Sequence, residues 1–169
     1  IASPNNPTGN TTDNADLRTI LDTGIPLVVD EAYVEFSEGD SSSLLEEYSN
    51  LMILRTFSKW AGLAGLRVGY GLFPEDIASL LMRVKPPYSV STLAQAAATK
   101  ALDNVEQSDE QLRIIVSERS KMFSSLKAMA DLKVYPSQGN FLLVEFVDRN
   151  AEQIKANLLK RGISVRYFD

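Results

Sequence analysis

The chain has 169 residues, of which 44% are hydrophobic, and a formal net charge of -5. This is the composition of an ordinary globular protein, and the negative charge disfavours nucleic acid or an anionic membrane as a partner. The chain contains no cysteine and no histidine, which excludes disulfides, thiolate nucleophiles, histidine-based general-base catalysis and metal sites built on thiolate or imidazole. An enzyme with this sequence would use lysine, acidic residues, tyrosine, arginine or a bound cofactor, and we expect no metal.

The first half of the chain predicts an α/β arrangement. After a loop rich in proline, asparagine and glycine, Asp13 marks the start of a short helix that Gly24 ends. Strands buried on both faces, as in parallel sheets, are predicted by three apolar runs: "IPLVVDEAY" at 25–33, "LMILRTF" at 51–57 and "LRVGYGLF" at 66–73. Strands that alternate with helices indicate the α/β class.

The next region is predicted to be helical. One helix follows Pro74 and stops before Pro86, a second begins at Ser91 or Thr92, and the longest covers about 108–130. The longest helix carries one stripe that we interpret as core packing. Its members are Leu112, Ile115, Val116, Arg119, Met122, Phe123, Leu126 and Met129.

The tail has a different pattern, which places a domain boundary near 105–110. The run "LKVYPSQGNFLLVEFV" predicts two short strands joined by a turn at Pro136–Gly139. A helix at 151–161 closed by Gly162 follows, and "ISVRYF" is predicted to be a final strand. We therefore divide the chain into a unit at 1–106 and a second unit at 107–169.

One lysine stands in a setting that is unusual for a surface residue. Lys59 follows the apolar run "LMIL" and the hydroxyl residues Thr56 and Ser58, and Arg67 comes eight positions later. A lysine whose pKa is lowered by its surroundings attacks carbonyl groups, and the cofactor built on that Schiff-base chemistry is pyridoxal phosphate. The phosphate of this cofactor needs backbone N–H groups, hydroxyls and an arginine. Thr56, Ser58 and Arg67 supply the hydroxyls and the arginine.

The strand at 25–33 and the amino-terminal loop supply the remaining groups. Asp30 would emerge at the carboxyl edge of the sheet, where open α/β folds bind ligands, and could hold the proton of the pyridinium nitrogen. Ala32, two residues on, is small enough for a ring to lie against it. Tyr33 and Asn6 are available as hydrogen-bond donors to the ring oxygen. Glu31 is expected to point away by strand alternation, and we assign it no role.

Three motifs occur in a fixed order along the chain: "SPNNPTG", "VVDEAY" and "TFSKWAGLAGLRVGY". In that order they resemble the fold-type-I pyridoxal phosphate-dependent aminotransferases, and among these the histidinol-phosphate aminotransferase family. The segments "KPPYSVSTLAQAAA", "PSQGNFLLVEF" and "GISVRYF" extend the likeness nearly to the end of the chain. The resemblance implies a mostly parallel sheet with helices on both faces, followed by a small α+β domain. Residues 1–106 would be part of the large cofactor-binding domain and 107–169 part of the small domain.

The resemblance also implies roles for individual residues. Catalysis would rest on Lys59 as the Schiff-base lysine and proton shuttle, on Asp30 as the pyridinium partner and on Tyr33. The implied cofactor-binding residues are Asn6, Asp30, Ala32, Tyr33, Thr56, Ser58, Lys59 and Arg67. Arg166 in "SVRYF" matches an arginine that contacts the substrate, and Asn140 in "GNF" fits the family pattern without an assigned role.

The implied reaction is transamination of histidinol phosphate with 2-oxoglutarate, which gives imidazole acetol phosphate and glutamate in histidine biosynthesis. Threonine-phosphate decarboxylase or another class I/II aminotransferase is the alternative within this chemistry. A non-catalytic effector domain of a transcription regulator, or an inactive fragment, is the alternative of another class. The effector domain would carry a winged-helix domain upstream of the chain.

The expected partners are a small-molecule amino donor and a 2-oxo acid, with a homodimer as the intact form and neither nucleic acid nor membrane involved. No apolar run approaches the ~20 residues that cross a bilayer, so we expect a soluble protein of the cytoplasm or plastid. The chain begins at Ile1 rather than at methionine and is interpreted as an internal piece of a longer protein. The amino-terminal half and a terminal carboxylate-binding arginine would then lie outside it.

Overall fold

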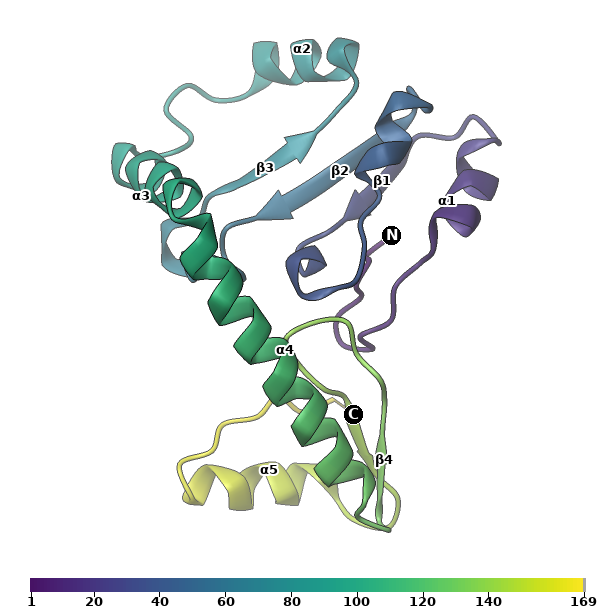
Figure 1. The fold of residues 1–169 in the computed structure, drawn as a ribbon, viewed down its shortest axis with the longest axis vertical. Coiled ribbons are helices and arrows are strands. Elements are labelled where there is room, and N and C mark those ends of the chain that lie inside the picture. The colour runs from purple at the N-terminus through teal and green to yellow at the C-terminus, as the bar shows by residue number, and fades with distance from the viewer. Residues whose placement is uncertain (169) are drawn as a thin grey trace.

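The computed structural model describes residues 1–168, which form two regions joined by one long helix (Figure 1). The helices are α1 (Asn14–Leu21), α2 (Glu75–Val84), α3 (Thr92–Asp103), α4 (Val105–Lys127) and α5 (Ala151–Lys160). The strands are β1 (Leu27–Asp30), β2 (Leu51–Thr56), β3 (Gly69–Leu72), β4 (Leu132–Val134) and β5 (Val144–Phe146). Three short 3₁₀ helices complete the set: η1 (Val34–Phe36), η2 (Ser42–Glu46) and η3 (Ala64–Leu66).

The helix starts follow the local signals in the sequence. The Asp13 carboxylate accepts a hydrogen bond from the Asp16 backbone N–H at 2.8 Å and so caps α1. The Ser91 hydroxyl accepts one from the Ala94 N–H at 3.2 Å and caps α3 in the same way. Pro74 stands directly before α2. The predicted helices near 13–24, 74–86, 91 and 151–161 are thus confirmed.

The larger sheet has the order β1-β2-β3 and is mixed rather than parallel throughout. β1 and β2 are parallel with Leu27 opposite Leu51, whereas β3 runs antiparallel to β2. Within the described residues the sheet therefore has one parallel and one antiparallel pair, and the expectation of three buried parallel strands is wrong for β3. The expectation that the strands are buried on both faces is also wrong, because Val28 and Leu54 on one face are 40% and 39% exposed.

The other face of this sheet carries the main core. α1 and η2 pack onto it, and the side chains involved are almost fully buried. The members of this cluster are Leu17, Leu21, Leu27, Val29, Leu44, Leu51 and Ile53. Burial of each such side chain contributes about 1.5–3 kcal/mol, so this cluster holds the carboxyl ends of β1 and β2 in place.

A second, smaller cluster forms where α3 packs on the segment after β2. Phe57, Val68 and Ala94 are its buried members, and Trp60 and Leu66 lie partly buried against them. The segment that carries Lys59 is therefore supported from beneath by α3, although Lys59 itself is exposed.

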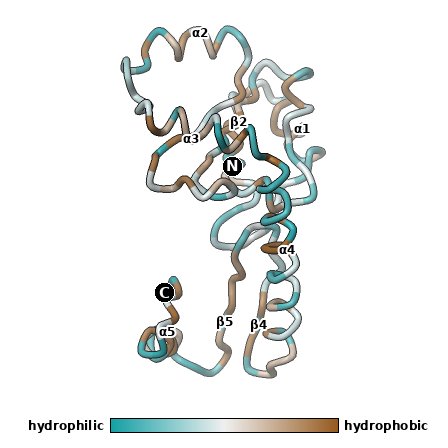
Figure 2. Tube along the Cα trace, turned by 60° about the vertical axis from the view of Figure 1, so that its left-hand side comes forward, coloured by the Kyte–Doolittle hydropathy of each residue, from teal (hydrophilic) through white to brown (hydrophobic). Residues whose placement is uncertain are grey.

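The long helix α4 differs from its predicted role. The interpretation of its stripe as core packing is only partly right, because no residue of α4 is buried and Met122 is 58% exposed. Figure 2 shows that α4 alternates polar and apolar residues along its length. Arg119, Phe123 and Leu126 of the stripe are half-buried.

The second region contains the hairpin of β4 and β5 and the helix α5. β4 pairs antiparallel with β5, with Leu132 opposite Phe146, which confirms the two predicted strands. The prediction of a final strand at 163–168 is wrong, because no strand is found there in the described part of the chain. A strand needs a hydrogen-bonding neighbour, and β4 and β5 pair only with each other. No described helix is both long and apolar enough to cross a membrane.

Candidate active site

The candidate site lies at the carboxyl ends of β1 and β2. Because these strands are parallel, with Asp30 opposite Leu54, the residues that follow both strands meet at one edge of the sheet. Asp30 is the last residue of β1, and Lys59 comes three residues after the end of β2. The amino-terminal segment joins this edge, since the Ser3 N–H donates to the Asp30 carbonyl at 2.9 Å.

Three of the predicted residues meet around one tyrosine ring. The Asn6 side-chain amide donates a hydrogen bond to the Tyr33 hydroxyl at 2.9 Å. The Lys59 ammonium lies 5.1 Å from the centre of the Tyr33 ring, a distance at which a cation is attracted by the π-electron face. The structure thus brings together Asn6, Tyr33 and Lys59, which are separated by up to 53 positions along the chain.

Asp30 and Ala32 are linked by a local turn at the same edge. One Asp30 carboxylate oxygen accepts a hydrogen bond from the Ala32 N–H at 3.0 Å, and the Asp30 side chain is exposed. The Asp30 N–H donates to the carbonyl of Ile1 at 2.8 Å, so both the N–H and the carbonyl of Asp30 are hydrogen-bonded to the amino-terminal segment. These bonds fix the exposed Asp30 carboxylate at the carboxyl end of β1.

The predicted phosphate ligands belong to two neighbouring backbone segments. The Ser58 N–H donates to the Thr56 hydroxyl at 3.0 Å, and the Phe57 N–H donates to the Val68 carbonyl at 3.2 Å. Arg67 directly precedes Val68 of this pairing and has a left-handed backbone conformation with φ 53°. Its guanidinium donates to the Ala64 carbonyl of its own turn at 3.0 Å.

Arg166 is not brought to this cluster. Its guanidinium carbon lies 4.9 Å from the centre of the Phe168 ring, and the residue is exposed. Among residues 1–168, the structure records that interaction for Arg166 and none with Asn6, Tyr33 or Lys59.

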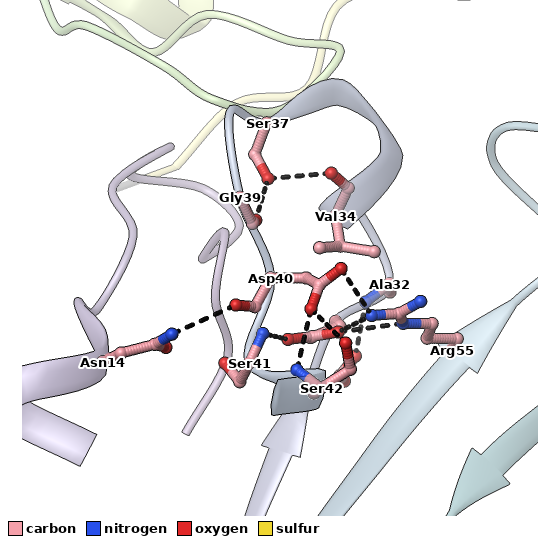
Figure 3. Close-up of polar contacts among 11 residues, drawn as sticks. Asn14, Ala32, Val34, Ser37, Gly39, Asp40, Ser41, Ser42 and Arg55 are labelled. Carbon is pink, nitrogen blue, oxygen red and sulfur yellow. Dashed lines mark hydrogen bonds and ion pairs between the residues drawn. The ribbon is translucent and has the colours of Figure 1, made fainter. Parts of the chain in front are cut away.

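An ion-pair network directly beneath the site was not foreseen. Glu31 is 1% exposed, and one of its carboxylate oxygens accepts from the Arg55 guanidinium at 2.9 and 2.7 Å. The other oxygen accepts from the Ser41 N–H at 2.7 Å. Asp40 adds a second carboxylate 3.3 Å from Arg55, and Figure 3 shows Arg55, Asp40 and Ser41 converging with Ser42 and Ala32. Nothing in the spacing of Glu31 and Arg55, 24 positions apart, signals this pair.

Burial and the contacts of this network together shift three pKa values. Burial lowers the pKa of Arg55, but the hydrogen bond and charge of Glu31 outweigh it and leave the pKa raised. Burial raises the pKa of Asp40, but the hydrogen bonds from Ser42 and the charge of Arg55 leave it below its ordinary value. Burial raises the pKa of Glu35 to about 7, against the opposing charge of Arg55.

A polar hollow of about 280 Å³ lies beside this network rather than at Lys59. Its lining includes Ser3, Glu31, Asp40, Ser41 and Gln138, and none of the predicted cofactor-binding residues. The hollow therefore belongs to the ion-pair network, and the candidate site is the open sheet edge.

A turn from the second region also reaches the site and was not foreseen. The Phe141 ring meets the Tyr33 ring edge-on, with centres 5.1 Å apart and an angle of 81°. Three residues before it, the Gln138 N–H donates to the Gly9 carbonyl at 2.7 Å. The turn thus contacts both the loop that carries Asn6 and the ring of Tyr33, whose hydroxyl accepts the Asn6 hydrogen bond.

The donor set at this edge fits pyridoxal phosphate. A carbonyl-reactive amine, an accessible carboxylate, an amide hydrogen-bonded to a phenol, two hydroxyls and an arginine are the groups that the cofactor requires. They are supplied by Lys59, Asp30, Asn6 with Tyr33, Thr56 with Ser58, and Arg67.

The comparison with known families agrees with this chemistry. Residues 1–169 match the family model for aminotransferase class I and II. The chain belongs to the class I and II aminotransferases. It is 50% identical over its whole length to a histidinol-phosphate aminotransferase of Dehalococcoides mccartyi, and it covers 47% of that relative. This aminotransferase chain thus spans about half the length of the curated relatives it matches.

Two solved structures have a fold similar to that of this chain. The histidinol-phosphate aminotransferase of Sinorhizobium meliloti in complex with pyridoxal 5'-phosphate has a TM-score of 0.84 at 29% identity, covering 98% of this chain and 47% of that one. The L-threonine-O-3-phosphate decarboxylase of Porphyromonas gingivalis has a TM-score of 0.83 at 24% identity, covering 95% and 50%. The first is a homologue of known cofactor content, and the second shows the fold alone.

Proposed function

We propose that the complete protein, by which we mean a chain of the relatives' length that carries these residues, is a pyridoxal phosphate-dependent histidinol-phosphate aminotransferase. Its reaction would transfer an amino group from histidinol phosphate to 2-oxoglutarate, giving imidazole acetol phosphate and glutamate. The observation that carries the proposal is the cluster in which the Asn6 amide donates to the Tyr33 hydroxyl and the Lys59 ammonium lies over the Tyr33 ring. The 50% identity to a histidinol-phosphate aminotransferase supports the choice of substrate.

Different residues of this chain would bind different parts of the cofactor. Asp30 would hold the proton on the ring nitrogen, Asn6 and Tyr33 would hydrogen-bond the ring oxygen, and Ala32 would lie against the ring. The phosphate would be held by Thr56, Ser58 and Arg67. Bound pyridoxal phosphate supplies an electron-withdrawing ring that stabilises negative charge on the carbon next to the amino group.

Lys59 would do the proton transfer. Its amine would hold the cofactor at rest and, once free, would act as the base that takes a proton from the substrate carbon and the acid that gives it back. The Tyr33 ring would help to position the Lys59 side chain, because a cation over an aromatic face is attracted by about 0.5–2 kcal/mol. Arg166 would contact the phosphorylated substrate.

The organisation of the complete protein follows the same proposal. Residues 1–106 would belong to the large domain with its mostly parallel sheet and helices on both faces, and 107–169 to the small domain. The partners would be the amino donor and the 2-oxo acid, within a homodimer. The likeness to the P. gingivalis decarboxylase carries the fold and no argument for decarboxylation.

The test labels the complete protein with pyridoxal phosphate, reduces it with borohydride and maps the pyridoxyl group by peptide sequencing. We expect the label on Lys59, and we expect Lys59→Arg to remove the label and lower kcat roughly 1,000-fold or more, because no other amine can take over both bond and proton. Lys85→Arg is the matched control, since Lys85 is also exposed and should change neither readout.

Turnover is followed as glutamate formed from 2-oxoglutarate and histidinol phosphate. A label on Lys85, or a Lys59→Arg variant that works at the wild-type rate, contradicts the proposal. Carbon dioxide released from threonine phosphate, in place of glutamate formation, would favour the decarboxylase. A label on Lys59 without any turnover would favour the effector domain or inactive fragment.

A further inference from the structure

One arginine of the long helix bridges the two regions of the molecule. The Arg119 Nη1 atom donates to the Phe36 carbonyl at 3.1 Å and to the Gly139 carbonyl at 2.8 Å. A terminal guanidinium nitrogen carries two hydrogens, so it can serve both acceptors at once. The carbonyls lie 83 and 20 positions from Arg119, and the helix that carries Arg119, α4, runs from one region to the other (Figure 1).

Both acceptors are carbonyls of buried residues. Phe36 is 2% exposed and Gly139 is buried, and a buried carbonyl without a hydrogen bond costs about 1–3 kcal/mol. Placing the arginine there also has a cost, because burial lowers the pKa of Arg119 against the opposing charge of Glu38. The two hydrogen bonds offset this cost, because a charge withdrawn from water is tolerated where it is hydrogen-bonded.

Both carbonyls belong to residues that lie close to the Tyr33 ring. Phe36 closes η1, and its N–H donates to the Tyr33 carbonyl at 3.1 Å. Gly139 precedes Phe141 by two residues, and the Phe141 ring packs edge-on against the Tyr33 ring at 5.1 Å. Arg119 therefore ties down the backbone on both sides of the Tyr33–Phe141 contact.

Tyr33 is in turn the centre of the candidate site, since its hydroxyl accepts from Asn6 and its ring lies under Lys59. We propose that Arg119 is a positioning residue, whose two hydrogen bonds to Phe36 and Gly139 set the place of the Tyr33 hydroxyl relative to Asn6 and Lys59. This inference rests on the proposed function. Arg119 touches neither the predicted cofactor residues nor the reacting atoms; it acts through Tyr33.

Kinetics on the complete holoenzyme provide the first test. We expect Arg119→Ala to lower kcat about 10- to 100-fold while the KM for histidinol phosphate stays within about threefold, because a misplaced group close to the chemistry slows the reaction without removing a substrate contact. Arg119→Lys keeps a charged nitrogen with several hydrogens and should recover most of kcat. Arg113→Ala, an exposed arginine of the same helix, is the matched control and should behave as the wild type.

A double-mutant cycle tests whether the effect passes through Tyr33. Tyr33→Phe removes the hydroxyl and keeps the ring, so Arg119→Ala added to it should lower kcat by less than about threefold more. Both single variants should also shift the pH midpoint of the bound cofactor's visible absorbance in the same direction. Full additivity of the two losses, or opposite absorbance shifts, overturns the proposal.

Hydrogen exchange of the apoprotein gives a readout that needs no cofactor. We expect Arg119→Ala to speed amide exchange in peptides covering 33–37 and 137–141, and Arg119→Lys to restore protection there. Unchanged exchange in both peptides overturns the proposal even if Arg119→Ala cannot be loaded with cofactor. If the wild type shows the expected exchange but no transaminase activity, the proposed function is contradicted. If the wild type is active and Arg119→Ala has the same kcat, this inference alone is contradicted.

Discussion

At the scale of single residues, Tyr33 combines three contacts of different kinds. Its hydroxyl accepts a hydrogen bond from Asn6, and its ring contacts both the Lys59 ammonium and the Phe141 ring, the latter in a T-shaped arrangement. A phenylalanine would keep the two ring contacts and lose the first, while a leucine would lose all three. The ring therefore orders the site as well as offering a hydroxyl to it.

Glu35 is a second residue whose surroundings matter, because it makes stability depend on pH. One of its carboxylate oxygens is buried and has no hydrogen-bond partner among residues 1–168. Burial raises its pKa to about 7, with the charge of Arg55 lowering it and that of Glu31 raising it. The folded protein thus holds a proton that the unfolded chain has already released above its ordinary carboxyl pKa of about 4.5.

We therefore expect the thermal stability of the complete protein to fall as pH rises from about 4.5 to about 7, and this contribution to level off above 7. Glu35→Gln cannot ionise, so it should be more stable than the wild type at pH 8 by about 1 kcal/mol, a value reduced for the partial exposure of the side chain. The two proteins should differ less at pH 5. Melting temperatures of the apoproteins between pH 5 and 8 measure this difference, with the exposed residue change Glu46→Gln as control. A constant offset at every pH would refute the prediction.

At the scale of elements, the loop that carries Asn6 is packed against the turn at 136–139. Gly9 has φ 77° and is buried, and a Cβ built on it would lie 2.5 Å from the Ser137 hydroxyl and 2.7 Å from its Cα. The Gln138 N–H donates to the Gly9 carbonyl at 2.7 Å. A side chain at position 9 would push the turn, and with it Phe141, away from the loop.

We expect Gly9→Ala to destabilise the complete protein by about 2–4 kcal/mol, as the sum of about 1 kcal/mol for the left-handed backbone and 1–3 for overpacking. Gly24→Ala is a matched control, because Gly24 also has φ 77° but a Cβ there meets nothing within 4 Å. It should cost only the backbone part, about 1 kcal/mol. Thermal unfolding of both variants separates the two contributions, and equal losses would show that the contact with Ser137 is unimportant.

At the scale of the whole molecule, residues 1–168 leave much apolar surface open. Val84 and Met82 of α2 are 76% and 66% exposed, and Tyr88 after it is 97% exposed. Single exposed apolar residues are ordinary, but several together mark a surface that another part of a protein covers. The curated relatives are about twice as long as this chain.

Residues 1–169 expressed alone should accordingly be poorly soluble and show little or no transaminase activity, despite carrying Lys59. The exposed apolar surface favours aggregation of the chain. Thr56, Ser58 and Arg67 would also be the only ligands that this chain offers to the cofactor phosphate, so we expect weak binding. Size-exclusion chromatography, visible absorbance with added pyridoxal phosphate and glutamate formation measure the three parts of this expectation. Robust steady-state turnover by this chain would mean that its own residues complete the site.

How much could be predicted differs between these scales. The starts of α1 and α3 were predictable because Asp13 and Ser91 cap N–H groups three residues away, and such short-range bonds need no knowledge of the fold. The candidate cofactor residues were likewise visible in the order and spacing of three motifs. What these motifs left open is which of the residues meet, and the structure brings Asn6, Tyr33 and Lys59 together while leaving Arg166 apart.

The sequence by itself determined the α/β class, most helices and strands, and the family to which the chain belongs, because these depend on local capping, on periodicity and on motif order. Only the tertiary structure decided that β3 runs antiparallel, that 163–168 forms no strand, and that Glu31 pairs with Arg55. It also decided that Arg119 reaches carbonyls 83 and 20 positions away. Such contacts depend on how distant segments are folded against each other, and a charged residue reads the same in the sequence whether water or a buried carbonyl is its partner.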